Sequence, residues 1–138
     1  MSIHLHLQIV GVLQILLALA HLTFPARFDW KAECSNLSLL NRQMFYVHAF
    51  FLCFTLVLFG LLNLVCTNEL LAPGRLAHFV LIGIAAFWFV RWLFQFFVYD
   101  PRLWRGHRWN TIIHIVFALL WSYFAGVYAW AAWRGGAL

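Results

Sequence analysis

The sequence predicts an all-α, polytopic integral membrane protein built as a four-helix, up-down-up-down transmembrane bundle. Hydrophobic residues make up 65% of the 138 residues and charged residues only 9%, and the mean hydropathy is +0.86. Almost all charged residues lie in short segments between four long apolar runs. A bilayer core about 30 Å thick requires roughly 20 apolar helical residues, and each run supplies that length.

The boundaries of the four helices follow from turn signals in the sequence. Phe24-Pro25 ends the first helix, Ala72-Pro73-Gly74 forms a tight turn, and Asp100-Pro101 ends the third helix. Short connections of this kind favour antiparallel neighbours. We expect a single transmembrane domain over residues 1–138, with spans at about 3–24, 41–67, 75–99 and 109–133.

The distribution of basic residues predicts the orientation in the membrane. The first and third connections carry six of them: Arg27, Lys31, Arg42, Arg102, Arg105 and Arg108. The opposite side has only Arg75 and Arg134. The positive-inside rule then places both basic loops in the cytoplasm and both termini outside, as expected for a bacterial cytoplasmic membrane. The net charge of +5 is explained by this asymmetry, so no nucleic acid partner is required.

Each predicted span carries one polar or small-residue stripe at helical spacing, which we expect to face the bundle interior. The first and fourth spans show the longest stripes: His4, Leu7, Gly11, Gln14, Ala18 and His21; and His114, Ala118, Ser122, Ala125 and Ala129. The other two are shorter: Asn41, His48 and Thr55; and Trp88, Arg91 and Gln95. Small residues in such a stripe let helix backbones approach closely in lipid.

Three of the histidines lie at a similar depth near the basic loops and form a candidate inner cofactor layer. Neutral imidazole is the commonest ligand for transition metals and an axial ligand for haem iron. His48 and His114 would sit on diagonally opposite helices and clamp haem b, with His21 as a neighbour. Arg91 would pair with the propionates, Gln95 shares the layer, and Trp88 is the aromatic residue best placed to wall the macrocycle.

A second layer of histidines lies near the opposite membrane surface. His4 or His6 could pair with His78 and hold a second haem. Two stacked haems would give a transmembrane path for electron transfer or a quinone-linked redox step. The pairing resembles that of membrane b-type cytochromes in general layout only, and no motif of that family is present.

Two other functions use the same residues differently. His21, His48 and His114 could form an open three-histidine site for zinc, iron or copper in a metal-dependent membrane enzyme. The four acidic residues, Asp29, Glu33, Glu69 and Asp100, all lie in loops, so hydrolysis lacks a buried general base. Alternatively, the chain is an accessory subunit that braces a larger membrane complex or a homo-oligomer, because its aromatic residues are too evenly spread to form one face.

Overall fold

The computed structural model describes residues 2–135 and contains only helices within that range. Four helices are long and apolar enough to cross a membrane: α1 (Ile3–His21), α4 (Leu39–Val65), α6 (Arg75–Phe97) and α7 (Arg108–Gly135). Shorter helices occupy the connections: α2 (Phe24–Arg27), α3 (Trp30–Glu33), α5 (Thr67–Leu71) and the 3₁₀ helix η1 (Pro101–Leu103). The expected all-helical class and the four membrane-length helices are confirmed.

The helix ends agree with the sequence signals to within a few residues. The second long helix begins at Leu39 because the side chain of Ser38 accepts a hydrogen bond from the backbone N–H of Asn41, at 3.4 Å. The third ends at Phe97, shortly before the predicted Asp100-Pro101 stop. The residues group into two compact units: residues 8–67, and residues 1–7 together with 68–138.

Within residues 8–67, α1 and α4 approach each other at two glycines. A Cβ atom built on Gly11 would lie 2.9 Å from the carbonyl oxygen of Gly60, and one on Gly60 would lie 2.9 Å from that of Gly11. One turn away, the side-chain amide of Asn63 donates a hydrogen bond to Gln14 Oε1 at 2.9 Å. Both amides are fully buried. Close backbone approach beside a hydrogen bond between helices is the usual packing mode in lipid.

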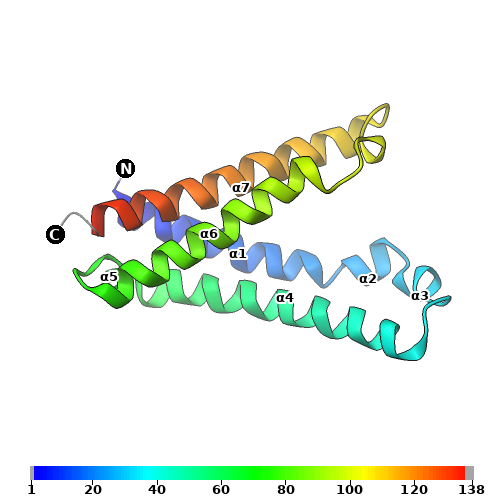
Figure 1. Ribbon diagram of the computed structural model, residues 1–138, viewed down its shortest axis with the longest axis horizontal. Coiled ribbons are helices and arrows are strands. Elements are labelled where there is room, and N and C mark those ends of the chain that lie inside the picture. The colour runs from blue at the N-terminus through cyan, green and yellow to red at the C-terminus, as the bar shows by residue number, and fades with distance from the viewer. Residues whose placement is uncertain (1, 136–138) are drawn as a thin grey trace. The chain divides into compact units, whose positions relative to one another are not determined.

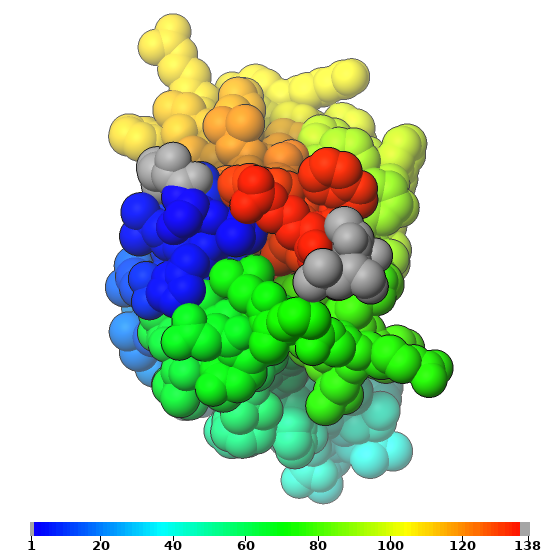
Figure 2. Space-filling view, turned by 90° about the vertical axis from the view of Figure 1, so that its left-hand side faces the viewer, coloured from blue at the N-terminus to red at the C-terminus, as the bar shows by residue number. Residues whose placement is uncertain are grey.

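Within residues 68–138, α6 and α7 lie side by side and run in opposite directions (Figure 1). Large aromatic side chains fill part of their contact. The ring of Trp88 stacks on Trp121 with a centroid distance of 5.1 Å and meets Phe124 edge-on at 4.7 Å. Such aromatic pairs contribute about 0.5–1.5 kcal/mol beyond the area they bury. The first turn of α1 lies beside the last turns of α7 in the same unit (Figure 2).

Burial confirms two of the four predicted interior stripes. On α1, Leu7, Gly11, Gln14 and Ala18 are buried, with His4 and His21 half-buried at its ends. On α6, Trp88 and Gln95 are buried and Arg91 is half-buried. On these two helices the predicted stripe marks the packed face.

The predicted stripes on α4 and α7 are wrong. Asn41 and His48 are exposed, and the buried face of α4 instead carries Leu56, Gly60 and Asn63. On α7, the stripe headed by His114 is half-buried or exposed throughout. Its buried face carries Trp121, Phe124, Val127, Tyr128, Ala131 and Ala132. On α7 the large aromatic residues Trp121, Phe124 and Tyr128 share the buried face with small residues, whereas on α4 the buried face holds no aromatic residue.

Candidate functional site

A hydrogen-bonded cluster of polar side chains lies on the α6–α7 pair, toward the loop that joins the two helices. Gln95 is at its centre and is only 6% exposed. Its Oε1 accepts hydrogen bonds from Arg91 Nη1 at 3.3 Å and from Trp121 Nε1 at 3.2 Å. Its Nε2 donates to His114 Nδ1 at 2.8 Å. Since Oε1 serves two donors, the orientation of the amide group is fixed by its neighbours.

The charge of Arg91 is solvated by aromatic and neutral polar groups. Its guanidinium carbon lies 4.9 Å from the ring centroid of Trp121 and 5.5 Å from that of Tyr99. Its Nη2 donates a hydrogen bond to the Tyr99 hydroxyl at 3.5 Å. Each cation–π contact contributes roughly 0.5–2 kcal/mol, depending on how far water is excluded. Together they hold the positive charge of Arg91 in the C-terminal half of α6.

His114 is held in one neutral tautomer. Because the Gln95 amide donates to Nδ1, that nitrogen is an acceptor and the ring proton resides on Nε2. The imidazole stacks on the indole of Trp104 at 3.9 Å and meets Phe96 edge-on at 5.8 Å. His114 therefore presents an N–H donor rather than a lone pair. Binding iron through Nε2 would require its proton to move and the bond to Gln95 to break.

The other two inner-layer histidines have the opposite tautomer. His48 Nδ1 donates to the carbonyl oxygen of Met44 at 2.6 Å, and His21 Nδ1 donates to that of Leu17 at 2.7 Å. A carbonyl oxygen only accepts, so Nδ1 carries a proton, and in the neutral imidazole Nε2 then carries a lone pair. Histidines that bind metals commonly have this arrangement, with the second nitrogen anchored on a backbone carbonyl. Both residues belong to the unit of residues 8–67.

Two of the three predicted outer-layer histidines, His6 and His78, contact the C-terminal half of α7. His78 Nδ1 donates to the carbonyl oxygen of Ala132 at 3.0 Å. His6 Nδ1 is 2.9 Å from the Tyr123 hydroxyl, and its ring meets Trp130 edge-on at 5.7 Å. His4 is half-buried. His6 and His78 thus use one ring nitrogen each to tie α1 and α6 to α7.

Trp88, the residue predicted to wall a macrocycle, packs against other aromatic side chains of the protein. It is 2% exposed, and its neighbours are Trp121, Phe124 and Phe87. Its indole N–H is buried and has no hydrogen-bond acceptor within residues 2–135. An orphaned donor of this kind costs about 1–3 kcal/mol. The residue is a core element of the α6–α7 contact in this structure.

The structure brings Arg91, Gln95 and His114 into one network, as their predicted common layer suggested. Within residues 2–135 it places no group of three or more His, Cys, Asp or Glu side chains where they could hold a metal ion. Sequence reasoning did not include Trp121 and Trp104 among the site residues. Trp121 follows His114 by two helical turns and therefore lies on the same side of α7. This spacing could have identified Trp121 as a neighbour of the site from the sequence.

Comparisons with protein family models, with curated proteins and with solved structures returned no match. The function of the chain is therefore argued from its own geometry.

Proposed function

We propose that this chain is a membrane-embedded haem-binding protein that serves electron transfer or a quinone-linked redox step. The observation that supports this proposal is the tautomer of His21 and His48. Each anchors Nδ1 on a carbonyl oxygen one turn earlier in its own helix and leaves Nε2 with a lone pair for iron. Imidazole in this state is the axial ligand of b-type haem.

The hydrogen bonds change the preferred ligands from those that the sequence suggested. His114 Nδ1 accepts a hydrogen bond from Gln95, and its proton is on Nε2, so His114 is better suited to donate a hydrogen bond than to bind iron. His48 lies on an exposed face of α4, where a planar group has access to it. We therefore rank His48 and His21 above His114 as axial ligands, and His78, with its free Nε2, as the outer-layer candidate.

The proposal includes an arrangement in the membrane. The four helices form an up-down-up-down bundle in a bacterial cytoplasmic membrane, with both termini outside and the loops around α2, α3 and η1 in the cytoplasm. The six basic residues of those loops support it. Fusing a cytoplasm-active and a periplasm-active reporter in turn to the C-terminus tests the orientation, and activity of the cytoplasmic reporter alone would contradict it.

An absorption spectrum of the purified, detergent-solubilised protein tests the haem proposal. We expect a Soret band that shifts on reduction with dithionite, and a loss of bound haem of at least about tenfold in His48→Ala and His21→Ala. The matched control is His107→Ala, because His107 lies exposed in the loop before α7, and this variant should retain its haem. A wild-type protein with no Soret band after expression with added haem precursor refutes the proposal.

A second function is favoured by a separate observation. Among the described residues, His6, His21, His48, His78 and His114 each already have a hydrogen bond within the protein. Histidines used in this way stabilise helix contacts without any cofactor, as expected for an accessory subunit of a larger membrane complex. Crosslinking in native membranes, followed by a blue native gel, should then show the chain only in a higher-mass band, with no haem or stoichiometric metal. The three-histidine metal enzyme receives no such support, since residues 2–135 contain no group of three or more His, Cys, Asp or Glu side chains that could hold a metal ion.

A further inference from the structure

Arg91 carries a permanent positive charge inside a membrane-length helix. It precedes the C-terminal residue of α6, Phe97, by six positions, which corresponds to about 9 Å along the helix axis. Charged side chains at such depth are costly and usually have a partner. A counter-charge is therefore expected near the guanidinium group.

No counter-charge for Arg91 is found within residues 2–135. All four acidic residues lie outside the long helices, and the only ion pair within residues 2–135 joins Arg102 to Asp100. The hydrogen-bond acceptors of Arg91 are the neutral oxygens of Gln95 and Tyr99, at 3.3 and 3.5 Å. These are long bonds for a group that forms contacts of about 2.7–2.9 Å with an oxyanion. The remaining N–H groups of its five have no acceptor in this part of the chain.

The guanidinium group is both oriented and accessible. Gln95 Oε1 is held by Trp121 Nε1, and the Trp121 ring lies against the guanidinium carbon. Arg91 bonds to residues four and eight positions later, so its side chain extends toward the loop end of α6, as a snorkelling arginine does. The residue is half-buried. Its orientation is therefore set before any ligand arrives.

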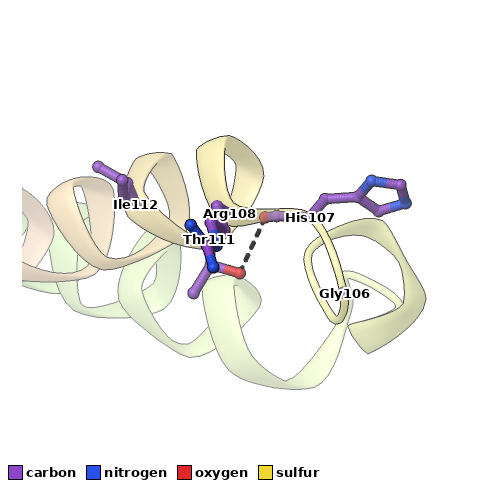
Figure 3. A pocket seen from close by; sticks show the side chains of 5 residues that line it. All are labelled: Gly106, His107, Arg108, Thr111 and Ile112. Atoms are coloured by element: carbon purple, nitrogen blue, oxygen red, sulfur yellow. Dashed lines mark hydrogen bonds between the residues drawn. The ribbon is translucent and has the colours of Figure 1, made fainter.

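The surroundings fit an amphiphile with an anionic headgroup. Phe94 and Phe97 on α6 are 50% and 80% exposed, which provides an apolar surface for acyl chains. The adjoining loop carries Arg102, Arg105 and Arg108, all exposed. An open hollow of about 500 Å³ at the start of α7 is lined by Gly106, His107, Arg108, Thr111 and Ile112. Beside it the His107 ring points away from Arg108 and Thr111 (Figure 3), and the three arginines add positive charge to this segment.

We propose that Arg91 binds the phosphate group of an anionic phospholipid from the leaflet next to the α6–α7 loop. The phosphodiester accepts hydrogen bonds from the guanidinium N–H groups that protein oxygens leave unused, and it neutralises the charge. Its acyl chains lie along the exposed phenylalanines of α6. The site is independent of the proposed haem ligands, because neither His21 nor His48 takes part.

Native mass spectrometry of the purified full-length protein tests this site. The protein is incubated in detergent with equimolar phosphatidylglycerol and phosphatidylcholine that have the same acyl chains. We expect about tenfold preferential retention of phosphatidylglycerol by the wild type, which corresponds to roughly 1.4 kcal/mol. Arg91→Gln should abolish the preference. The matched control is Arg134→Gln: Arg134 also lies over a tryptophan ring, Trp130 at 5.2 Å, but at the opposite end of α7, and its loss should leave the preference unchanged.

A second variant keeps the proposal testable if Arg91→Gln does not fold. Gln95→Glu retains the arginine and supplies a carboxylate at the position of its present neighbour, so it should also abolish the phosphatidylglycerol preference. Inorganic phosphate in excess should not compete, because it has no acyl chains.

Three results would overturn the proposal: equal retention of both lipids by the wild type; unchanged preference in Arg91→Gln and Gln95→Glu; or loss of the Soret band in Arg91→Gln with lipid retention intact. The last result would assign Arg91 to a haem propionate. Recording the absorption spectrum of each sample separates failure of the lipid site from failure of the haem proposal.

Discussion

The α1–α4 contact and the α6–α7 contact bury polar groups in different ways. The first brings two backbones together at Gly11 and Gly60 and closes over a neutral amide pair. The second packs stacked tryptophans between its helices and places a charged side chain, Arg91, against one of them. A contact with no space around its polar groups can only stabilise the fold. A contact whose donors exceed its acceptors can bind a ligand, and for this reason the candidate lipid site lies on the α6–α7 pair.

The largest expected effect of a single substitution is at the glycine contact. In Gly11→Ala the new Cβ would lie 2.9 Å from a backbone oxygen and 3.0 Å from Asn63 Cβ, so the helices must separate. Overpacking of this kind costs about 1–3 kcal/mol. The control is Gly83→Ala, where the Cβ meets nothing within 4 Å and the higher helix propensity of alanine should stabilise slightly. Thermal unfolding in one detergent compares the two, and equal midpoints would show that the close approach carries no stability.

Gln95→Leu should lower the stability of the fold by a similar amount, because it removes hydrogen bonds rather than adding a clash. The substitution leaves Arg91, Trp121 and His114 without their shared partner, and each abandoned buried donor or acceptor costs about 1–3 kcal/mol before relaxation. We expect a destabilisation of about 2 kcal/mol and a change in tryptophan fluorescence, because Trp121 loses its acceptor. Gln43→Leu, at an exposed position at the start of α4, is the control. A fluorescence spectrum that does not change in Gln95→Leu would contradict the described network.

The hydrogen-bonded pair Gln14 and Asn63 should contribute less to the stability of the fold than the Gly11 contact or the Gln95 network. A double-mutant cycle of Gln14→Leu and Asn63→Leu isolates the coupling between the two side chains. We expect a coupling energy of about 0.6 kcal/mol, and not more than about 1.7, as for other hydrogen bonds between helices in membranes. A coupling energy near zero, measured by denaturation in mixed detergent micelles, would assign the stability of α1–α4 to the glycines alone.

The smallest effect is expected at the exposed loop between α6 and α7. Hydrogen bonds from the Arg102 side chain and then from its backbone N–H lower the pKa of Asp100 below its ordinary value of 3.8. A lowered pKa in the folded state stabilises the protein above pH 3.8, and this contribution is lost as the pH falls through the lowered value. Asp100→Asn should therefore flatten the dependence of the unfolding temperature on pH below about 4. A variant with the same acid dependence as the wild type would show that this ion pair is energetically neutral.

Much of the fold could be predicted from the sequence, because length and hydropathy are sufficient to define membrane helices. The α1 stripe from Leu7 to Ala18 was also predictable, since Gly11, Gln14 and Ala18 differ sharply from the leucines around them. The α4 and α7 stripes were not. In lipid, apolar side chains gain little from burial against one another, so hydropathy alone does not tell a lipid-facing phenylalanine from a packed one. Phe124 is fully buried whereas Phe97 is 80% exposed.

The sequence by itself determined that the chain has four membrane-length helices, a charge asymmetry between its connections, and a layer that contains Arg91, Gln95 and His114. Tertiary structure alone decided that His114 offers an N–H, whereas the backbone of their own helices sets which ring nitrogen His21 and His48 offer. That choice depends on the group that the other nitrogen meets: a backbone carbonyl for His21 and His48, and the Gln95 amide for His114. The same residue type thereby offers a lone pair in one place and an N–H donor in another, because a neutral imidazole has only one proton to share between its two nitrogens.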